Sequence, residues 1–142
     1  MPSPSGTAYN SFREKLATGV ISLGTGVHSF KLALLTAYTP NVDSHALWAD
    51  VSAKEVSGAG YTGGGVALTG ATLSRDDTAD QLKFDADDAA WTGLDVGTPS
   101  HAVLRDISAT GEPLIGYWPV TTPTNGGNYT IQFDTLGVLR FS

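Results

Sequence analysis

Residues 55–68 read Glu-Val-Ser-Gly-Ala-Gly-Tyr-Thr-Gly-Gly-Gly-Val-Ala-Leu. This stretch holds five of the seventeen glycines of the chain, with Tyr61 between them. Glycine costs backbone entropy on folding, so a glycine cluster is useful where the chain needs positive φ angles or where two backbones approach closely. Because an apolar run follows, the stretch predicts an ordered turn that leads into a strand.

The same glycines could be taken for a phosphate-binding loop. Gly58, Gly60 and Gly63 match the spacing Gly-x-Gly-x-x-Gly. That spacing is informative only between a strand and a helix of a βαβ unit, and here a strand is expected to follow. The chain also lacks the Lys-Ser/Thr pair of a P-loop at this point. We therefore interpret the stretch as a structural loop and assign no cofactor or cofactor-binding residue.

On both sides of the glycine stretch, short apolar or alternating runs are separated by Gly, Pro, Asn and Asp, as is typical of an all-β domain. Residues 30–35 predict a central strand, and residues 129–133 and 138–141 predict a hairpin. The other expected strands are residues 66–73, 81–86, 91–96, 101–107 and 114–118. This pattern favours a jelly-roll-like β-sandwich with one short N-terminal helix.

The expected helix lies near the N-terminus. Tyr9, Phe12 and Leu16 recur at helical spacing, and Gly19 follows where a C-terminal glycine is expected. A helix of about three turns is too short to be stable alone, so its apolar stripe should dock on the domain or on a neighbouring subunit. We expect residues 1–8 to form an N-terminal arm and residues 9–142 to form a single domain.

Composition narrows the possible partners. The net charge of −6 disfavours direct nucleic-acid binding, because phosphates would be repelled. No run approaches the roughly 18 apolar residues of a membrane span. The chain has no cysteine, so disulfides and thiolate metal sites are excluded. Partners are expected to be proteins or small neutral groups.

No residue pattern predicts a catalytic or metal-binding site. Seven aspartates lie between residues 76 and 95, but their spacing is not that of a calcium loop. The three histidines are scattered, and no serine lies in a Gly-x-Ser-x-Gly motif. We therefore name no catalytic or metal-binding residue and expect a protein that is not an enzyme. A small glycan hydrolase, testable at Asp87 and Asp88, remains an alternative.

Several short sequence segments, which we call phrases, occur along the chain in an order that matches a known protein family. They are residues 9–16, Tyr-Asn-Ser-Phe-Arg-Glu-Lys-Leu; residues 30–36, Phe-Lys-Leu-Ala-Leu-Leu-Thr; residues 38–40, Tyr-Thr-Pro; residues 50–65; residues 84–91; residues 113–117; and residues 129–140. In these phrases the chain resembles a family of small virion structural proteins of tailed bacteriophages, encoded among head and neck genes. Residues 101–106, His-Ala-Val-Leu-Arg-Asp, depart from the Tyr-Ala-Val-Leu-Tyr pattern of such proteins.

The resemblance implies a non-enzymatic virion protein, made in the host cytoplasm and assembled as a capsid decoration or cement protein. A neck, collar or tail-fibre-anchoring component, with a carbohydrate-binding role included, is the alternative. The implied partners are the major capsid protein or neck and tail proteins, together with further copies of the chain, a trimer being favoured. The candidate interaction residues are Tyr9, Phe12, Leu16, Trp48 and Tyr61.

Overall fold

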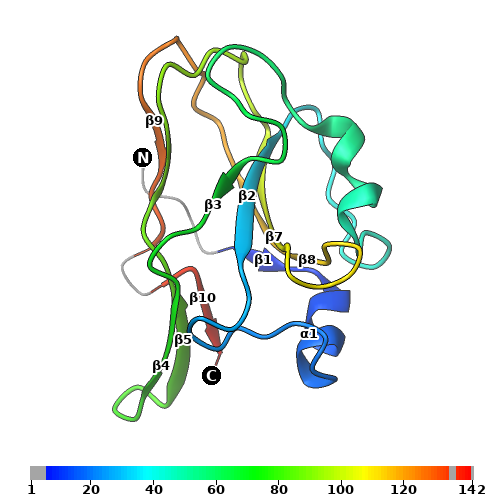
Figure 1. Cartoon of the computed structure of the whole chain (residues 1–142), viewed down its shortest axis with the longest axis vertical. Helices are drawn as coiled ribbons and strands as arrows, with labels where there is room; N and C mark the ends of the chain where they lie inside the picture. Colours follow the sequence, from blue (N-terminus) through cyan, green and yellow to red (C-terminus); the bar gives the residue numbers. More distant parts are fainter. Residues whose placement is uncertain (1–5, 135–136, 142) are drawn as a thin grey trace.

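The structure is a computed structural model that describes residues 6–134 and 137–141. In chain order its elements are β1 (Thr7–Ala8), α1 (Asn10–Ala17), β2 (Phe30–Leu35), the 3-10 turns η1 (Trp48–Asp50) and η2 (Ser52–Lys54), β3 (Val66–Ala67), β4 (Thr72–Asp76), β5 (Gln81–Asp85), β6 (Ala89–Trp91), β7 (His101–Asp106), β8 (Leu114–Pro119), β9 (Tyr129–Ile131) and β10 (Leu139–Phe141). The predicted β-rich chain with one short N-terminal helix is confirmed (Figure 1).

The strands form three antiparallel sheets. A five-stranded sheet has the order β1-β8-β7-β2-β3, a three-stranded sheet has the order β10-β5-β4, and β6 pairs with β9. Residues 30–35 form β2, which lies between β7 and β3 as expected of a central strand. All six residues of β2 pair with β7, from Phe30 opposite Asp106 to Leu35 opposite His101.

Apolar side chains gather in two clusters. The main cluster joins one face of the five-stranded sheet, including Leu32, Leu104 and Trp118, to side chains of the smaller sheets such as Phe84 and Trp91. A second cluster contains residues of the opposite face of the same sheet and of the chain that covers it, namely Tyr9, Leu35, Tyr38, Val51, Val103 and Leu114. The alternation of side chains along each strand divides them between the two clusters.

The predicted C-terminal hairpin is wrong. β9 pairs with β6, whereas β10 pairs with β5, so two consecutive strands belong to different sheets. In this arrangement Leu139 lies opposite Phe84 and Phe141 lies opposite Leu82, which brings the end of the chain onto the main cluster. Burial against a distant strand therefore overrides the local alternation that suggested a hairpin.

Two other predicted strands have different bounds. Residues 66–73 are divided into β3 and β4, and Gly70 between them has a φ of +65°. Residues 91–96 leave the sheet directly after Trp91, where β6 ends. In both places the chain turns because it moves from one sheet to another.

The predicted apolar stripe of Tyr9, Phe12 and Leu16 is divided, because α1 begins at Asn10 and Tyr9 precedes it with an extended backbone. Tyr9 and Phe12 are fully buried, one in each apolar cluster, and Gly19 follows α1 with a φ of +83°. Thr7 and Ala8 form β1 beside β8, so the sheet begins before the expected domain boundary at residue 8. Residues 1–5 of the predicted arm lie outside the described residues.

Candidate interaction surface

The glycine-rich stretch is an ordered loop held against two backbones. A Cβ atom at Gly60 would collide with the carbonyl of Gly93, and one at Gly65 would collide with the carbonyl of Leu32. Both glycines have positive φ angles, +78° and +89°. The predicted close approach between backbones is thus present, and the loop leads into β3.

Tyr61 anchors this loop from within. Its hydroxyl donates to Glu55 Oε2 at 2.8 Å and accepts from the Leu34 amide at 3.1 Å. Its ring stacks on Trp91, with 6.5 Å between the centroids. Burial raises the pKa of the Tyr61 hydroxyl above its ordinary value. These contacts make Tyr61 part of the scaffold.

Tyr9 and Trp48 are also held by contacts within the chain. The Tyr9 hydroxyl lies 2.7 Å from that of Tyr38, which in turn lies 2.8 Å from His45 Nδ1. Trp48 is half-buried, and the guanidinium carbon of Arg105 lies 3.9 Å above its ring. Three of the five residues proposed from the sequence, Tyr9, Trp48 and Tyr61, therefore have structural partners of their own.

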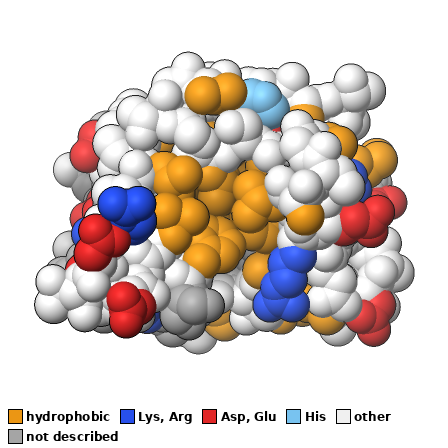
Figure 2. Space-filling view, turned by 90° about the horizontal axis from the view of Figure 1, so that it is seen from below, with side chains coloured by type: hydrophobic (Ala, Val, Ile, Leu, Met, Phe, Trp, Pro, Cys, Tyr) orange, Lys and Arg blue, Asp and Glu red, His pale blue; other side chains and the backbone are white. Residues whose placement is uncertain are grey.

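Leu16 instead lines an open surface depression of about 680 Å³, which we call the apolar hollow. Its lining residues are Leu16, Gly19, Ile21, Ser22, Leu23, Gly24, Leu73, Leu82 and Phe141. None of these side chains is charged. Figure 2 shows apolar side chains gathered in a depression on this end of the molecule. Leu82, which lines the apolar hollow, is 37% exposed.

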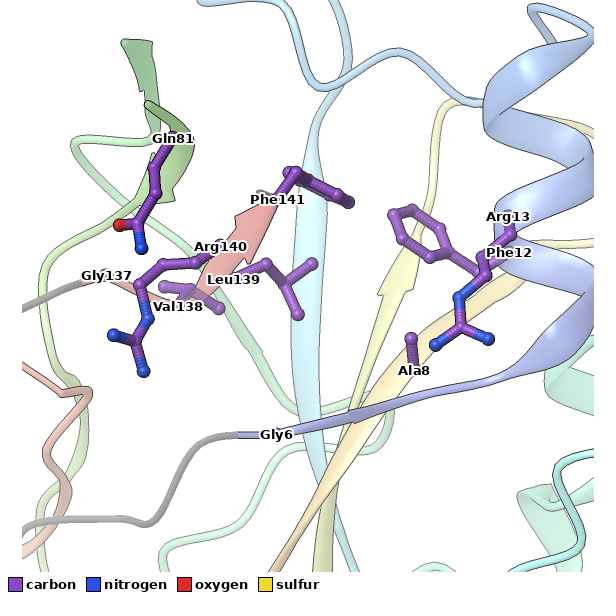
Figure 3. Close-up of a pocket in the computed structure, with 10 residues that line it drawn as sticks. All are labelled: Gly6, Ala8, Phe12, Arg13, Gln81, Gly137, Val138, Leu139, Arg140 and Phe141. Atoms are coloured by element: carbon purple, nitrogen blue, oxygen red, sulfur yellow. The ribbon is translucent and has the colours of Figure 1, made fainter. Parts of the chain in front are cut away.

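Phe12 lines a second opening of about 360 Å³, between β1, α1 and β10, which we call the β10 pocket. Figure 3 shows Leu139 and Phe141 pointing toward Phe12, while Arg140 between them points away. The rings of Phe12 and Phe141 lie 6.3 Å apart. Phe141 lines both openings, so the apolar hollow and the β10 pocket adjoin.

Aspartates of the acidic stretch, residues 76–95, accept hydrogen bonds from neighbouring segments of the chain. Asp87 Oδ2 accepts from the Thr69 hydroxyl at 3.0 Å, and Asp88 Oδ1 accepts from the Phe133 amide at 2.9 Å. Within residues 6–134 and 137–141, no group of three or more His, Asp or Glu side chains is placed to hold a metal ion.

The rings of His45 and His101 both pack on Tyr38, whereas His28 has a different partner. His28 pairs with the buried Asp106, His45 with Tyr38, and His101 with Ser100. Burial lowers the pKa of His101. The structure does not bring these side chains into one site.

Sequence reasoning missed Leu82, Phe141 and the arginines Arg13 and Arg140. Leu82 and Phe141 do belong to alternating runs, which indicated one apolar face of each strand. Whether such a face is covered depends on sheets that meet only in three dimensions.

No protein-family model matches the chain, and no curated protein or solved structure is significantly similar to it. The helix that the described residues contain is too short to cross a bilayer. The resemblance to phage virion proteins therefore stays a prediction.

Proposed function

We propose that this chain is a structural protein of a tailed-phage virion and that it decorates the head through non-covalent protein contacts. The observation that carries a contact role is the apolar hollow, which is open, uncharged in its lining and lined mainly by aliphatic side chains and Phe141. Exposed apolar patches rimmed by polar residues mark surfaces where proteins meet. The assignment to a virion rests on the phrases of residues 9–16, 50–65 and 129–140.

The proposed fold is a jelly-roll-like sandwich of the five-stranded sheet against the smaller sheets. The main apolar cluster supports it, because it takes side chains from all three sheets. Such a compact scaffold suits a protein that adds many copies to a lattice. In the proposed assembly, copies associate in a cyclic oligomer, with a trimer favoured, and weak contacts with the major capsid protein are multiplied by effective concentration.

Purified chain added to heads that lack it tests this proposal. We expect uptake in a fixed number of copies per head and an increased resistance of the heads to heat. Electron microscopy should show density over the whole head. Density confined to the neck or tail would instead support the collar or fibre-anchoring alternative, and the absence of bound density would refute a virion role at both places.

A matched pair of variants connects uptake to the apolar hollow. Leu82→Glu places a carboxylate in the hollow, whereas Ala90→Glu places one at an exposed position on β6, outside the hollow. We expect only Leu82→Glu to reduce uptake, by about tenfold or more, since a carboxylate would be desolvated at the contact. Equal uptake of both variants would exclude the hollow as the contact surface.

A further inference from the structure

A polar pocket of about 400 Å³ lies beside β9 and shares no lining residue with the apolar hollow or the β10 pocket. Figure 1 shows β9 toward the end of the molecule that is opposite to α1 and β4. The residues that line this pocket, which we call the β9 pocket, are Thr122, Asn128, Tyr129, Thr130 and Gln132. Its volume falls within the range of about 300–1,000 Å³ that is usual for sites that bind small molecules.

Polar side chains form a row on one face of β9. Tyr129 and Ile131 are buried, whereas Asn128, Thr130 and Gln132 are exposed. Successive side chains of a strand point to opposite faces, so these three share one face and extend over about 13 Å. The row therefore presents amide and hydroxyl groups that a bound molecule can contact along its length.

The neighbouring strand leaves the middle of this row accessible. Ala90 of β6 lies directly opposite Thr130 and is exposed. Directly opposite residues share a face of the sheet, and alanine carries only a methyl group. No long side chain therefore covers Thr130 from this position of β6.

The walls of the β9 pocket are held in place by contacts within the chain. The Tyr129 hydroxyl donates to the Thr122 carbonyl at 2.8 Å, and the Tyr129 ring meets that of Trp91 edge-on at 6.3 Å between centroids. In the loop before β9, the Gly126 amide donates to the Leu94 carbonyl at 2.8 Å. A site that is already ordered loses less conformational entropy when a ligand binds.

The lining specifies a ligand without charge. The chain has eight basic and fourteen acidic residues, but none of the described residues that line the β9 pocket is charged. A charged ligand would lose water there without gaining a counter-charge. An apolar ligand would remove water from the Asn128 amide and the Thr130 hydroxyl, whose side chains have no hydrogen-bond partner among the described residues. Amides and hydroxyls both donate and accept, and the hydroxyls of a neutral sugar do the same.

We propose that the β9 pocket binds a neutral oligosaccharide through the side chains of Asn128 and Thr130. The groups that would bind it lie on the face of β9 and not on its backbone edge, which favours a sugar over an added peptide strand. Glycoside hydrolysis commonly uses a pair of carboxylates, and the described lining contains none, so this pocket holds the sugar without cleaving it. The inference does not depend on the decoration role.

The test is an NMR titration of the full, isotope-labelled chain. The probes are neutral tetramers of glucose, galactose, mannose and N-acetylglucosamine. For each tetramer that binds, one control carries a carboxylate at C6 of every unit and another has all its hydroxyls methylated. We expect saturable shifts of the amide signals of residues 128–132 with a neutral tetramer, and at least about tenfold weaker binding of both controls.

Variants of the chain locate the bound sugar. Thr130→Val keeps the shape of the side chain and removes its hydroxyl, so it should weaken binding by roughly fivefold. Asn128→Ala should weaken it by a similar factor. The matched control is Thr78→Val, at an exposed position in the turn between β4 and β5, which should change the affinity by less than about twofold. Urea denaturation checks that each variant is folded.

Three results would overturn this inference: no binding of any neutral tetramer, equal binding of the carboxylate form, or an unchanged affinity of Thr130→Val. So would tighter binding of the peptide acetyl-Val-Thr-Val-Thr-Val-amide at residues 128–132, because the pocket would then be a strand-pairing edge.

Uptake by heads separates this inference from the decoration role. Leu82→Glu should bind the tetramer normally, and Thr130→Val should be taken up by heads normally. Uptake by heads of a parent chain that binds no tetramer would remove the sugar site and leave the decoration role. A parent chain that binds a tetramer but is not taken up by heads would do the opposite.

Discussion

The two apolar clusters of this protein lie on opposite faces of one sheet. They differ in whether their edges are closed by other groups or open to the surface. The second cluster, around Tyr9 and Tyr38, is closed by hydroxyl groups that bond to each other and to His45. The main cluster is closed near Tyr61 but opens at Leu82 and Phe141 into the apolar hollow. Hydroxyl groups thus close the second cluster, whereas the apolar hollow is lined by uncharged and mainly apolar side chains, and we propose it as the contact surface.

The largest expected effect is a difference in stability between a variant in the interior of the main cluster and a variant at its open end. Phe12 is 1% exposed, so Phe12→Ala should lower the free energy of unfolding by about 3–5 kcal/mol. Leu16→Ala, at the half-buried rim of the hollow, should cost about half as much or less, because solvent can fill the space. Urea denaturation of the two variants measures the difference, and equal losses would show that the rim is as tightly packed as the interior.

A second pair tests the closed end of the main cluster. Gly65→Ala should destabilise the fold by about 2–4 kcal/mol, since an alanine there is strained at positive φ and its Cβ meets the Leu32 carbonyl. Gly63→Ala is the control, because no heavy atom lies within 4 Å of the Cβ position. Thermal unfolding distinguishes them. A tolerated Gly65→Ala would mean that the loop is not pressed against β2.

The hydroxyls of the second cluster predict a pH dependence. Burial, and then the bond with Tyr38, raises the pKa of Tyr9 above its ordinary value near 10. The unfolded chain therefore loses this proton first, and the contribution to stability is present below about pH 10 and declines above it. Tyr9→Phe should reduce the slope above pH 10 by about 1.4 kcal/mol per pH unit. An unchanged slope in chemical denaturation would contradict the buried assignment.

The smallest expected effect on stability lies in the apolar hollow. Leu82→Ser should lower the free energy of unfolding by about 1 kcal/mol or less, because the side chain is already 37% exposed. The same variant should reduce uptake by heads several-fold. Co-sedimentation with heads, beside a denaturation curve, measures both. A large loss of stability together with normal uptake would reverse the roles assigned to the two ends of the main cluster.

The elements that local chemistry determines were predictable from the sequence. A helix followed from the spacing of Tyr9, Phe12 and Leu16, although Tyr9 itself lies before α1. The ordered loop followed from the clustered glycines. The partner of the last strand was not predictable, because the pairing of Leu139 with Phe84 depends on a sheet assembled from distant segments. For the same reason Tyr61 and Trp48 could be recognised as prominent aromatics, but their contacts with Glu55 and Arg105 could not.

The partners of the terminal strands also bear on how the chain folds. β1 joins residue 7 to residue 117, and β10 returns to β5 across the segment that forms two other sheets. Pairings between distant residues fold slowly, on the scale of milliseconds to seconds for β-rich domains. Because β10 pairs with β5, the three-stranded sheet can be completed only after Leu139–Phe141 has been synthesised. Until then β5 lacks this neighbour, so the apolar residues of the incomplete sheet are exposed to aggregation or to chaperones.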